Sequence, residues 1–577
     1  MASFLEGLGI TSLNPVNSFP AYHGAYAVGT VDVEIPVSDL PAPCELPEGG
    51  AETIAFRIFY PCHKSEDNPR PVRWISQPQR ATISAFAKFV GANHRLAGLI
   101  SYMPQQLFWI KLPAWRNAAL LEPPTTNGRW PVTFFSHGLA GSRNAYSYVC
   151  GDMASNGMIV IALDHRDGSS PIQYVRATTS SEARIIGPTK ITHEPCREAF
   201  EGRDKQLRIR LWEMSLAYEA LMKIDAGELV ENLDSNTSWS RKERMEVLEQ
   251  FAGMLDIHRQ GRVSWAGHSF GAVTTVQLLK SIHYYREKPA DALAPLIEPK
   301  SDAAIVGQIT AESPTLLLDM WCLPLRSPDQ HWLWDRPLPS YTSAGPKGDN
   351  VLSVLSEAFY NWEDNRNTTR YIIAGPQTSR RPSTVPRLTR DKGRLLPDWA
   401  RLRDVSPASS TRDSGYASGS TPSVHSSRQQ SRTSMSIGST QKSAKSGNAS
   451  SERTKGPHMF YPARSQHFNQ SDYGILFPWI AKRFTKAEEP ERILELNVRA
   501  MVQVIRESGI EVAGEDDKEI LDKEAGLRRW IYAPVVDTPI EDTSAMLDNI
   551  SRRLSVGSVR TAAPRDGMTM GMKTIDI

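Results

Sequence analysis

Short runs of apolar residues alternate along the chain with longer segments in which apolar residues recur every three or four positions. Residues 53–60 (TIAFRIFY) alternate as an early strand does, while residues 130–136 (WPVTFFS) and 158–163 (MIVIAL) are continuously apolar. Continuous runs of this length that end in turn-forming residues are typical of central strands buried on both faces. Residues 262–266 (RVSWA) form a further run of this kind.

Two segments carry the period of an amphipathic helix. In the first, apolar residues recur at spacings of four and three between Leu207 and Leu221. The second lies between Pro490, which suits a first helical turn, and Gly509, which suits a helix stop. Strands that alternate with such helices predict an α/β fold, with a mainly parallel central sheet and helices on both of its faces.

The apolar pattern is interrupted once and ends before the C-terminus. Residues 406–451 contain 17 serines in 46 positions, and Val424 and Ile437 are the only Val, Ile, Leu, Phe or Trp residues there. Such a segment cannot bury enough apolar area to offset its ordering entropy. We therefore expect structured parts at residues 20–375 and 457–535, a disordered Ser/Arg-rich insertion at 376–456 and a disordered tail at 536–577.

Charge and cysteine content narrow the class of protein. The chain carries 66 basic and 64 acidic residues in 577, so no polyanion-binding surplus exists and nucleic acid is not an expected partner. Five scattered cysteines without a Cys-x-x-Cys pair predict reduced thiols rather than a disulfide scaffold or a thiolate metal site. The N-terminal sequence lacks the pattern of a secretion signal, and no apolar stretch of about 18 residues occurs. We expect an intracellular, cytoplasmic protein that does not span a membrane.

The strongest chemical motif directly follows the run RVSWA. It is Gly267-His268-Ser269-Phe270-Gly271, and an apolar helical pattern follows it over residues 272–282. In the order strand, Gly-x-Ser-x-Gly, helix, the chain turns so sharply that side chains at Gly267 and Gly271 would collide with their neighbours. The turn would expose Ser269 as a nucleophile at the N-terminus of a helix. The alternative is an ordinary tight turn.

A second glycine-containing loop, His137-Gly138-Leu139-Ala140-Gly141, follows the run PVTFFS. In hydrolases with a Gly-x-Ser-x-Gly turn, an early strand supplies one oxyanion donor from such a loop, and the residue after the nucleophile supplies the other. The backbone N–H groups of Leu139 and Phe270 are thus the expected oxyanion hole. A turn without a ligand is the alternative.

The order serine, acid, histidine places the remaining two groups after Ser269. The histidines in that part of the chain are His283, His331, His425, His458 and His467. Of these, His467 lies in a loop after the short apolar run MFYPA, where a catalytic histidine is expected, whereas His425 lies in the insertion. Asp319 ends the apolar run PTLLL and suits the acid that orients the imidazole. The alternative for Asp319 is a carboxylate that caps a turn.

Five segments together resemble the platelet-activating factor acetylhydrolase family, the lipoprotein-associated and intracellular type II members of the α/β-hydrolases. They are residues 134–169, RDKQLRIRLWEM, VSWAGHSFGA, LLLDMWCLPL and SQHFNQSD. The resemblance covers residues 20–375 and 457–510. It implies that Ser269, Asp319 and His467 are nucleophile, acid and base, with Leu139 and Phe270 as oxyanion donors. The chain departs from the family in its Ser-rich insertion and in lacking the secretion signal of the plasma members.

The segment Asp164-His165-Arg166-Asp167 also concentrates groups that can bind a metal. Its spacing does not suit zinc, and hydrolysis by a serine triad needs no ion. We therefore interpret it as a structural charged loop and expect neither a metal nor a cofactor.

Residues 83–115 are rich in large apolar side chains with a few interspersed basic ones. Such a segment can lie on a lipid surface, and the family resemblance implies contact with lipid through an amphipathic helix. Leu107, Phe108 and Trp109 are the expected membrane contacts. A cap helix that is buried over the active site is the alternative.

The motifs predict a serine esterase, and the family resemblance implies a calcium-independent one of the 1-alkyl-2-acetylglycerophosphocholine esterase type, which removes short or oxidised sn-2 acyl groups from phospholipids at a membrane surface. One alternative is a general carboxylesterase or lipase acting on neutral esters. Another is a phosphorylation-controlled interaction protein on an inactive hydrolase fold.

Basic residues stand two or three positions before Ser383, Ser431 and Ser555. Basophilic kinases read such patterns, so a kinase is an expected partner of the insertion and tail. A passive solvated linker is the alternative.

Overall fold

The strands that position the site belong to one twelve-stranded sheet, seen in a computed structural model that describes residues 18–64, 70–89, 91–102, 106–290, 295–375, 455–478 and 487–536. The strand order is β14-β13-β12-β11-β10-β5-β6-β2-β1-β4-β3, and β9 pairs with β5. The strands are β1 (Ala27–Pro36), β2 (Thr53–Cys62), β3 (Pro71–Arg73), β4 (Lys111–Arg116), β5 (Trp130–Ser136), β6 (Ile159–Leu163), β9 (Leu255–Asp256), β10 (Ser264–His268), β11 (Thr315–Leu318), β12 (Val351–Val354), β13 (His458–Pro462) and β14 (Trp530–Tyr532).

The centre of the sheet is parallel, as predicted. Strands β13, β12, β11, β10, β5 and β6 run side by side in the same direction. Strands β2 and β14 add to this block in antiparallel fashion at its two sides. Because the central strands are parallel, the chain leaves β5, β6, β10, β11 and β13 at one common edge, where catalytic loops gather in open α/β sheets.

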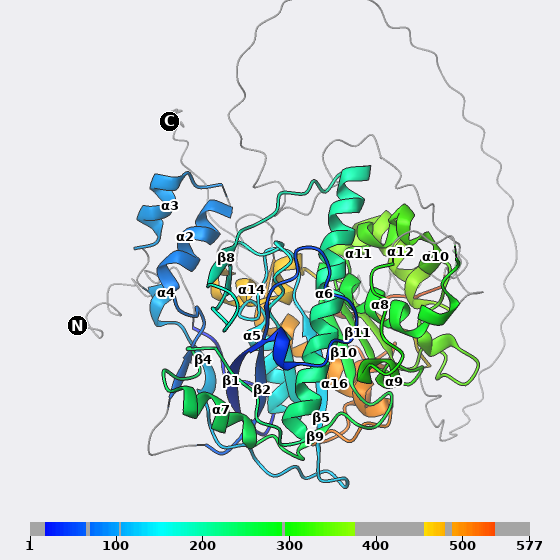
Figure 1. Cartoon of the computed structure of the whole chain (residues 1–577). Coiled ribbons are helices and arrows are strands. Elements are labelled where there is room, and N and C mark those ends of the chain that lie inside the picture. Colours follow the sequence, from blue (N-terminus) through cyan, green and yellow to red (C-terminus); the bar gives the residue numbers. More distant parts are fainter. Residues whose placement is uncertain are drawn as a thin grey trace, which may run out of the picture.

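Helices cover both faces of the sheet, so the predicted α/β-hydrolase fold class is confirmed (Figure 1). Helices α6 (Arg197–Asp225) and α8 (Phe270–His283) pack on one face, and α5 (Ser147–Ser155) and α16 (Pro490–Glu507) pack on the other. The other α-helices are α2 (Gln79–Phe89), α3 (His94–Ile100), α4 (Gln106–Trp109), α7 (Arg241–Glu249), α9 (Ala304–Gln308), α10 (His331–Trp334), α11 (Glu357–Asn361), α12 (Glu363–Ile373) and α14 (Asp472–Leu476).

Short 3-10 helices and one hairpin connect these elements. The hairpin pairs β7 (Gln173–Val175) with β8 (Arg184–Ile186). The 3-10 helices are η1 (Val37–Asp39), η2 (Tyr285–Glu287), η3 (Leu323–Arg326), η4 (Pro328–Gln330), η5 (Pro339–Tyr341), η6 (His467–Gln470) and η7 (Lys518–Leu521).

The part of the chain after residue 455 completes the sheet begun by the first part. Strand β13 pairs with β12, and α16 contributes its apolar side to the core on the opposite face from α8. The expected insertion and tail lie outside the described residues, apart from residues 455, 456 and 536. Their predicted disorder and phosphorylation stay predictions.

All five cysteines are free thiols. Within the described ranges, no helix is long and apolar enough to cross a bilayer.

Candidate active site

Ser269 occupies a strained turn between β10 and α8. Its backbone has φ 59° and ψ −117°, a region that non-glycine residues rarely adopt. A Cβ atom on Gly271 would lie 1.9 Å from the carbonyl oxygen of Ser136, and one on Gly267 would lie 2.4 Å from the backbone of Gly271. The chain therefore needs glycine at both positions to present Ser269 at the edge of the sheet.

The structure brings Ser269, His467 and Asp319 together from three separate parts of the chain. His467 Nε2 lies 3.0 Å from Ser269 Oγ, and His467 Nδ1 lies 2.9 Å from Asp319 Oδ2. Asp319 directly follows β11, and His467 begins η6. Asp319 is fully buried, whereas Ser269 and His467 keep exposures of 3% and 8%. This is the arrangement in which a histidine can take the proton of a serine and hold it against a carboxylate.

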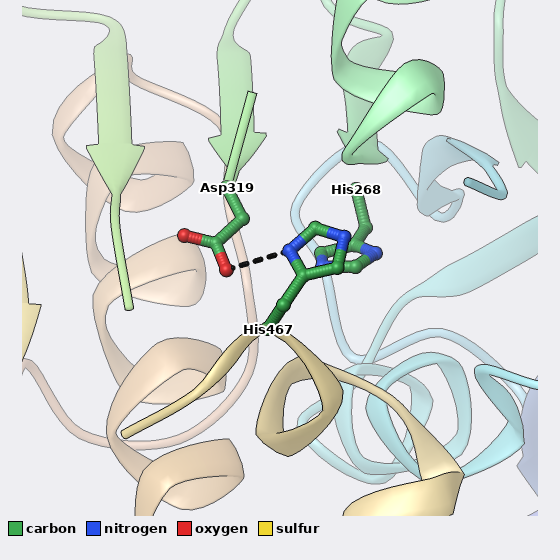
Figure 2. A group of neighbouring side chains, drawn as sticks. All are labelled: His268, Asp319 and His467. Atoms are coloured by element: carbon green, nitrogen blue, oxygen red, sulfur yellow. Dashed lines mark hydrogen bonds and ion pairs between the residues drawn. The ribbon is translucent and has the colours of Figure 1, made fainter. Parts of the chain in front are cut away.

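The imidazole of His467 is held between two rings. Phe359 stacks on it with ring centres 4.5 Å apart and planes 6° apart. The ring of His268, drawn beside His467 in Figure 2, has its centre 4.4 Å away. The second carboxylate oxygen of Asp319 accepts a hydrogen bond from the backbone N–H of Ser356. Ring packing and this hydrogen bond fix the orientation of both groups.

His268 is held by Tyr146, a contact that the sequence did not predict. The Tyr146 hydroxyl accepts a hydrogen bond from the backbone N–H of Gly138 at 3.2 Å and lies 2.7 Å from His268 Nδ1. Because a hydroxyl can accept and donate at the same time, Tyr146 can accept from Gly138 and donate its proton to this nitrogen. Burial, together with the neighbouring His467, holds the pKa of His268 well below its usual value. His268 thus stays neutral beside His467.

The predicted oxyanion donors lie in the two loops that meet at Ser269. Neither the N–H of Leu139 nor that of Phe270 makes a hydrogen bond with another described residue. A Cβ on Gly138 would lie 2.9 Å from Cβ of Ser269, so the loop that carries Leu139 runs directly against the serine. Phe270 is the first residue of α8, whose N-terminus favours negative charge. Two unused donors beside a serine can stabilise a developing oxyanion.

The charged segment after β6 is largely buried, and Asp167 in it pairs with an arginine of α6. Asp167 and Arg210 form an ion pair at 2.5 Å, and Arg210 donates to the carbonyl oxygen of His137 at 2.7 Å. Burial opposes ionisation of Asp167, but Arg210 outweighs it and the pKa of Asp167 is lowered. Of the oxyanion loop, the residue before Gly138 is thus tied to α6, which agrees with the structural role predicted for this segment.

A second hydrogen-bonded network of a serine, a histidine and a carboxylate lies behind that loop, and we call it the Ser136 network. Ser136 Oγ is 2.8 Å from His165 Nε2, and His165 Nδ1 is 2.8 Å from Glu213 Oε2. Burial raises the pKa of Glu213 to about 8, and burial also holds the pKa of His165 well below its usual value. No local motif joins these residues, since they come from β5, the loop after β6 and α6.

His268, Asp319 and His467 also satisfy a distance test for a shared metal ion, because one ligand atom from each lies within 4.8 Å of the others. Both ring nitrogens of His467 already face Ser269 and Asp319, however. A metal ligand would have to give up one of these contacts, so the hydrogen bonds favour a triad. Among the residues with described positions, no other group of three such side chains meets the test, and the Asp164 to Asp167 segment is not one.

The expected membrane contacts divide into two kinds. Trp109 is 64% exposed, whereas Leu107 and Phe108 are half-buried and pack against the core. The neighbouring exposed side chains are Leu96 (46%), Leu99 (64%) and Tyr102 (56%). These positions lie within the expected apolar segment but outside its three named contacts, because α2, α3 and α4 are separate short helices whose outward sides do not follow one period.

Comparison with known proteins gives a consistent family. The model for "Platelet-activating factor acetylhydrolase, isoform II" matches residues 11–333, which are 323 of the 577 residues. A protein of Schizosaccharomyces pombe named "Putative phospholipase A2" is 27% identical over 529 residues, covering 89% of this chain and 97% of its own length. The platelet-activating factor acetylhydrolases of Cavia porcellus and Bos taurus are 31% and 30% identical, each match covering 47% of this chain.

The extent of these matches differs along the chain. The alignments span 54% of the two mammalian relatives, about half of their length. The family match includes Ser269 and Asp319 but ends before His467, whose place therefore rests on its contacts. A ferulic acid esterase from Streptomyces cinnamoneus aligns at a TM-score of 0.27 with 20% identity, over 55% of this chain and 71% of its own.

Proposed function

The chain belongs to the platelet-activating factor acetylhydrolase isoform II family, and from this premise we propose that it is a calcium-independent serine hydrolase that removes short or oxidised sn-2 acyl groups from phospholipids at an intracellular membrane surface. The observation that carries the proposal is the contact of His467 with both Ser269 and Asp319 beside two unused backbone donors. The names of the relatives support a phospholipid ester as the substrate class.

In the first half of the reaction, Ser269 Oγ attacks the sn-2 ester carbonyl carbon while its proton moves to His467 Nε2. The carbonyl oxygen becomes an oxyanion, which accepts hydrogen bonds from the N–H groups of Leu139 and Phe270. Asp319 stabilises the imidazolium through Nδ1. Collapse of the tetrahedral intermediate breaks the bond to the glycerol oxygen, which takes the proton from Nε2 and leaves as the lysophospholipid.

In the second half, a water molecule gives its proton to His467 Nε2 and attacks the acyl carbon on Ser269. The same two N–H groups hold the second oxyanion. The intermediate then releases the carboxylic acid, and the proton on Nε2 returns to Ser269 Oγ. Every group in this cycle is a side chain or a backbone amide, which supports calcium independence.

Hydrolysis of phospholipids with sn-2 chains of increasing length tests the substrate. We expect turnover to be highest for acetyl and short or oxidised chains and to fall for long saturated ones. Ser269→Ala serves as the matched control, and a fluorophosphonate probe should label the native protein but not this variant. Faster turnover of a neutral triglyceride than of the acetyl phospholipid would favour a general lipase. Absence of both labelling and turnover would favour an inactive fold.

Membrane contact forms the second part of the proposal. Of the nine exposed large apolar side chains among the described residues, Leu96, Leu99, Tyr102 and Trp109 fall within 14 consecutive positions. We call these four the apolar tip. In Figure 1 the helices α2, α3 and α4 project together at one side of the molecule, away from α9 and α10. Clustered apolar exposure of this kind marks a contact surface.

The inner side of the same segment faces the histidine loop. Ile83 and Ala87 of α2 are buried, and Phe86 lies 6.3 Å, between ring centres, from Tyr473. Trp74, just before α2, donates to Asp472, five residues after His467. The cap and membrane interpretations are thus compatible, since one side packs inward and the other is exposed.

Paired substitutions test the tip. Leu99→Ser with Trp109→Ser should weaken binding to phosphatidylcholine vesicles by about 10-fold or more, because each side chain loses burial worth about 1.5–3 kcal/mol. Leu229→Ser with Trp239→Ser is the matched control, since Leu229 and Trp239 are 69% and 87% exposed elsewhere. Turnover of a water-soluble ester should be unchanged in both variants. Equal loss of vesicle binding in the control would contradict a role for the tip.

A further inference from the structure

Arg166, in the charged segment after β6, borders a pocket that the proposed reaction does not use. The pocket has a volume of about 540 Å³, including its open mouth. It is lined by the loop that follows Leu139, by α2 and by the β7 hairpin. The charged side chains in its wall are Arg143, Arg166, Arg176 and Asp164. We propose that this pocket binds a phosphate group.

The main observation is that Arg166 is buried without enough acceptors. Its side chain is 2% exposed, and within the part of the chain that the structure describes neither Nε nor Nη1 has a hydrogen-bond partner. The remaining nitrogen, Nη2, has only long contacts, 3.3 Å to Glu34 and 3.4 Å to the carbonyl of Tyr174. Buried N–H groups without acceptors are costly and rare. An acceptor within the pocket would remove that cost.

The other two arginines are fixed in place. Arg143 Nη2 lies 2.6 Å from Asp234 Oδ2, and Arg176 Nη2 lies 2.7 Å from Asp234 Oδ1. Asp234, together with Glu34, lies behind the wall and offsets much of its positive charge. The affinity must therefore come from directed hydrogen bonds to Arg166 rather than from long-range attraction. A phosphate suits this site, because its oxygens accept several hydrogen bonds and guanidinium groups donate them.

The position of the pocket relates it to Ser269. Asp164 and Ser269 directly follow β6 and β10, which lie on either side of β5 in the sheet. Two strand spacings separate them laterally by about 10 Å. Five covalent bonds join an sn-2 carbonyl carbon to the phosphorus of a phospholipid, and a hydrogen bond adds about 3 Å. This reach is comparable with the lateral separation between Ser269 and the start of the segment that carries Arg166, so the pocket is a candidate site for the phosphodiester of an ester at Ser269, an inference that rests on the proposed function.

Two measurements test the site, using the full chain. The first is binding of inorganic phosphate and of glycerophosphocholine by calorimetry. The second compares KM and kcat for a short-chain phospholipid and for a water-soluble neutral ester. The variants are Arg166→Gln and, as the matched control, Arg57→Gln. Arg57 is 1% exposed, has an unpartnered Nη1 and pairs with Asp32 in the same ionic network, but it does not line the pocket.

We expect Arg166→Gln to raise the phospholipid KM by about 10-fold or more at nearly constant kcat. Neutral-ester kinetics should not change, and Arg57→Gln should leave the phospholipid KM unchanged. Weaker phosphate binding with an unchanged phospholipid KM would still support the site, but for free phosphate. If native protein binds neither phosphate probe and the phospholipid KM is unchanged in Arg166→Gln, the proposal is wrong. Equal losses on both esters, or in both variants, would also overturn it.

The more exposed Arg176 provides a second test if Arg166→Gln does not fold. Arg176→Gln should weaken phosphate binding, because it removes a positive charge from the wall and leaves Glu34 and Asp234 behind it less neutralised, while the 22% exposure of the Arg176 side chain favours retention of the fold. Unchanged phosphate affinity in that variant would overturn the proposal. Failure of the proposed function is distinguishable: native protein would then bind phosphate but hydrolyse no phospholipid.

Discussion

Two hydrogen-bonded networks of a serine, a histidine and a carboxylate, the Ser269 network and the Ser136 network, lie at the same edge of the sheet, yet only the first is arranged for catalysis. In the first, Ser269, His467 and Asp319 are joined at 3.0 and 2.9 Å. In the second, Ser136, His165 and Glu213 are joined at 2.8 and 2.8 Å. Hydrogen-bond distances alone therefore do not distinguish a nucleophile from a structural serine.

The backbone around each serine makes the difference. Ser136 ends β5 in an extended strand and is fully buried, whereas Ser269 has a positive φ and retains slight exposure. Beside Ser269, the N–H groups of Leu139 and Phe270 make no hydrogen bond to any residue with a described position. The carbonyl oxygen of Ser136, in contrast, is packed so closely on Gly271 that a Cβ there would lie 1.9 Å away. The Ser136 network thus supports the turn that exposes Ser269.

Removal of the serine hydroxyl should distinguish the Ser269 network from the Ser136 network most strongly. Ser269→Ala should lower kcat for a soluble ester by about 10⁴-fold or more, since no other group can form the acyl-enzyme. Ser136→Ala should lower it by less than about 10-fold and reduce stability by about 1–3 kcal/mol, because His165 loses a buried partner. Steady-state kinetics and chemical denaturation measure both. A comparable fall in kcat for the two variants would show that the two networks do not differ in role.

Exchange of the carboxylate gives the next largest contrast. Asp319→Asn should lower kcat by about 10³- to 10⁴-fold, because an amide favours the wrong tautomer of His467. Glu213→Gln should change soluble-ester kcat by only a few-fold, since the amide oxygen of the new side chain can still accept from the N–H of Arg166 as the Glu213 carboxyl does. The same assay checks both variants. Loss of activity in Glu213→Gln at unchanged stability would assign the Ser136 network a direct part in the reaction.

Much of the Ser269 network could be predicted from sequence, because the backbone around its residues leaves local signals. Two glycines around Ser269 mark the turn, and apolar runs that end at Asp319 and shortly before His467 place those residues at strand ends. The insertion between Asp319 and His467 did not hide this pattern, because it adds no apolar run that could pass for a strand.

The Ser136 network could not be predicted from sequence. Ser136, His165 and Glu213 lie on three elements, and their contact depends on how α6 packs on the sheet. The same holds for the ring of Phe359 on His467, whose residues are brought together by tertiary packing alone. Side chains that meet through packing leave no fixed spacing in the sequence.

Gly138 tests the contact between the two regions, since its loop passes between them. Gly138→Ala would introduce a Cβ 2.9 Å from Cβ of Ser269 and 3.0 Å from the Tyr146 hydroxyl. The loop must then move, and the N–H of Leu139 with it, so kcat should fall by about 10²-fold, as when one oxyanion donor is lost. KM should change little. Gly128→Ala, at a glycine with φ +64° and no atom near its Cβ, is a control for general backbone strain.

The smallest expected effect is the pH dependence of stability that Glu213 contributes. Burial raises its pKa in the folded protein to about 8, above its value of about 4.3 in unfolded chains. Between these values the folded state binds more protons than the unfolded state, so its contribution falls as pH rises through that range. Glu213→Gln, which mimics the protonated carboxyl, should come within about 1 kcal/mol of native stability near pH 5.

Above pH 8 the same variant should exceed native stability by up to a few kcal/mol, since each pH unit between the two pKa values contributes at most about 1.4 kcal/mol. Urea denaturation at pH 5, 7 and 9 measures the difference between the two proteins, which removes the contributions of all other groups. Glu182→Gln, at an exposed carboxylate, should show no pH-dependent difference. A constant difference between native protein and Glu213→Gln across this range would mean that Glu213 is ionised in the fold. His165 would then carry the proton between Ser136 and a charged carboxylate, which is the role that the proposed reaction gives to His467 between Ser269 and Asp319.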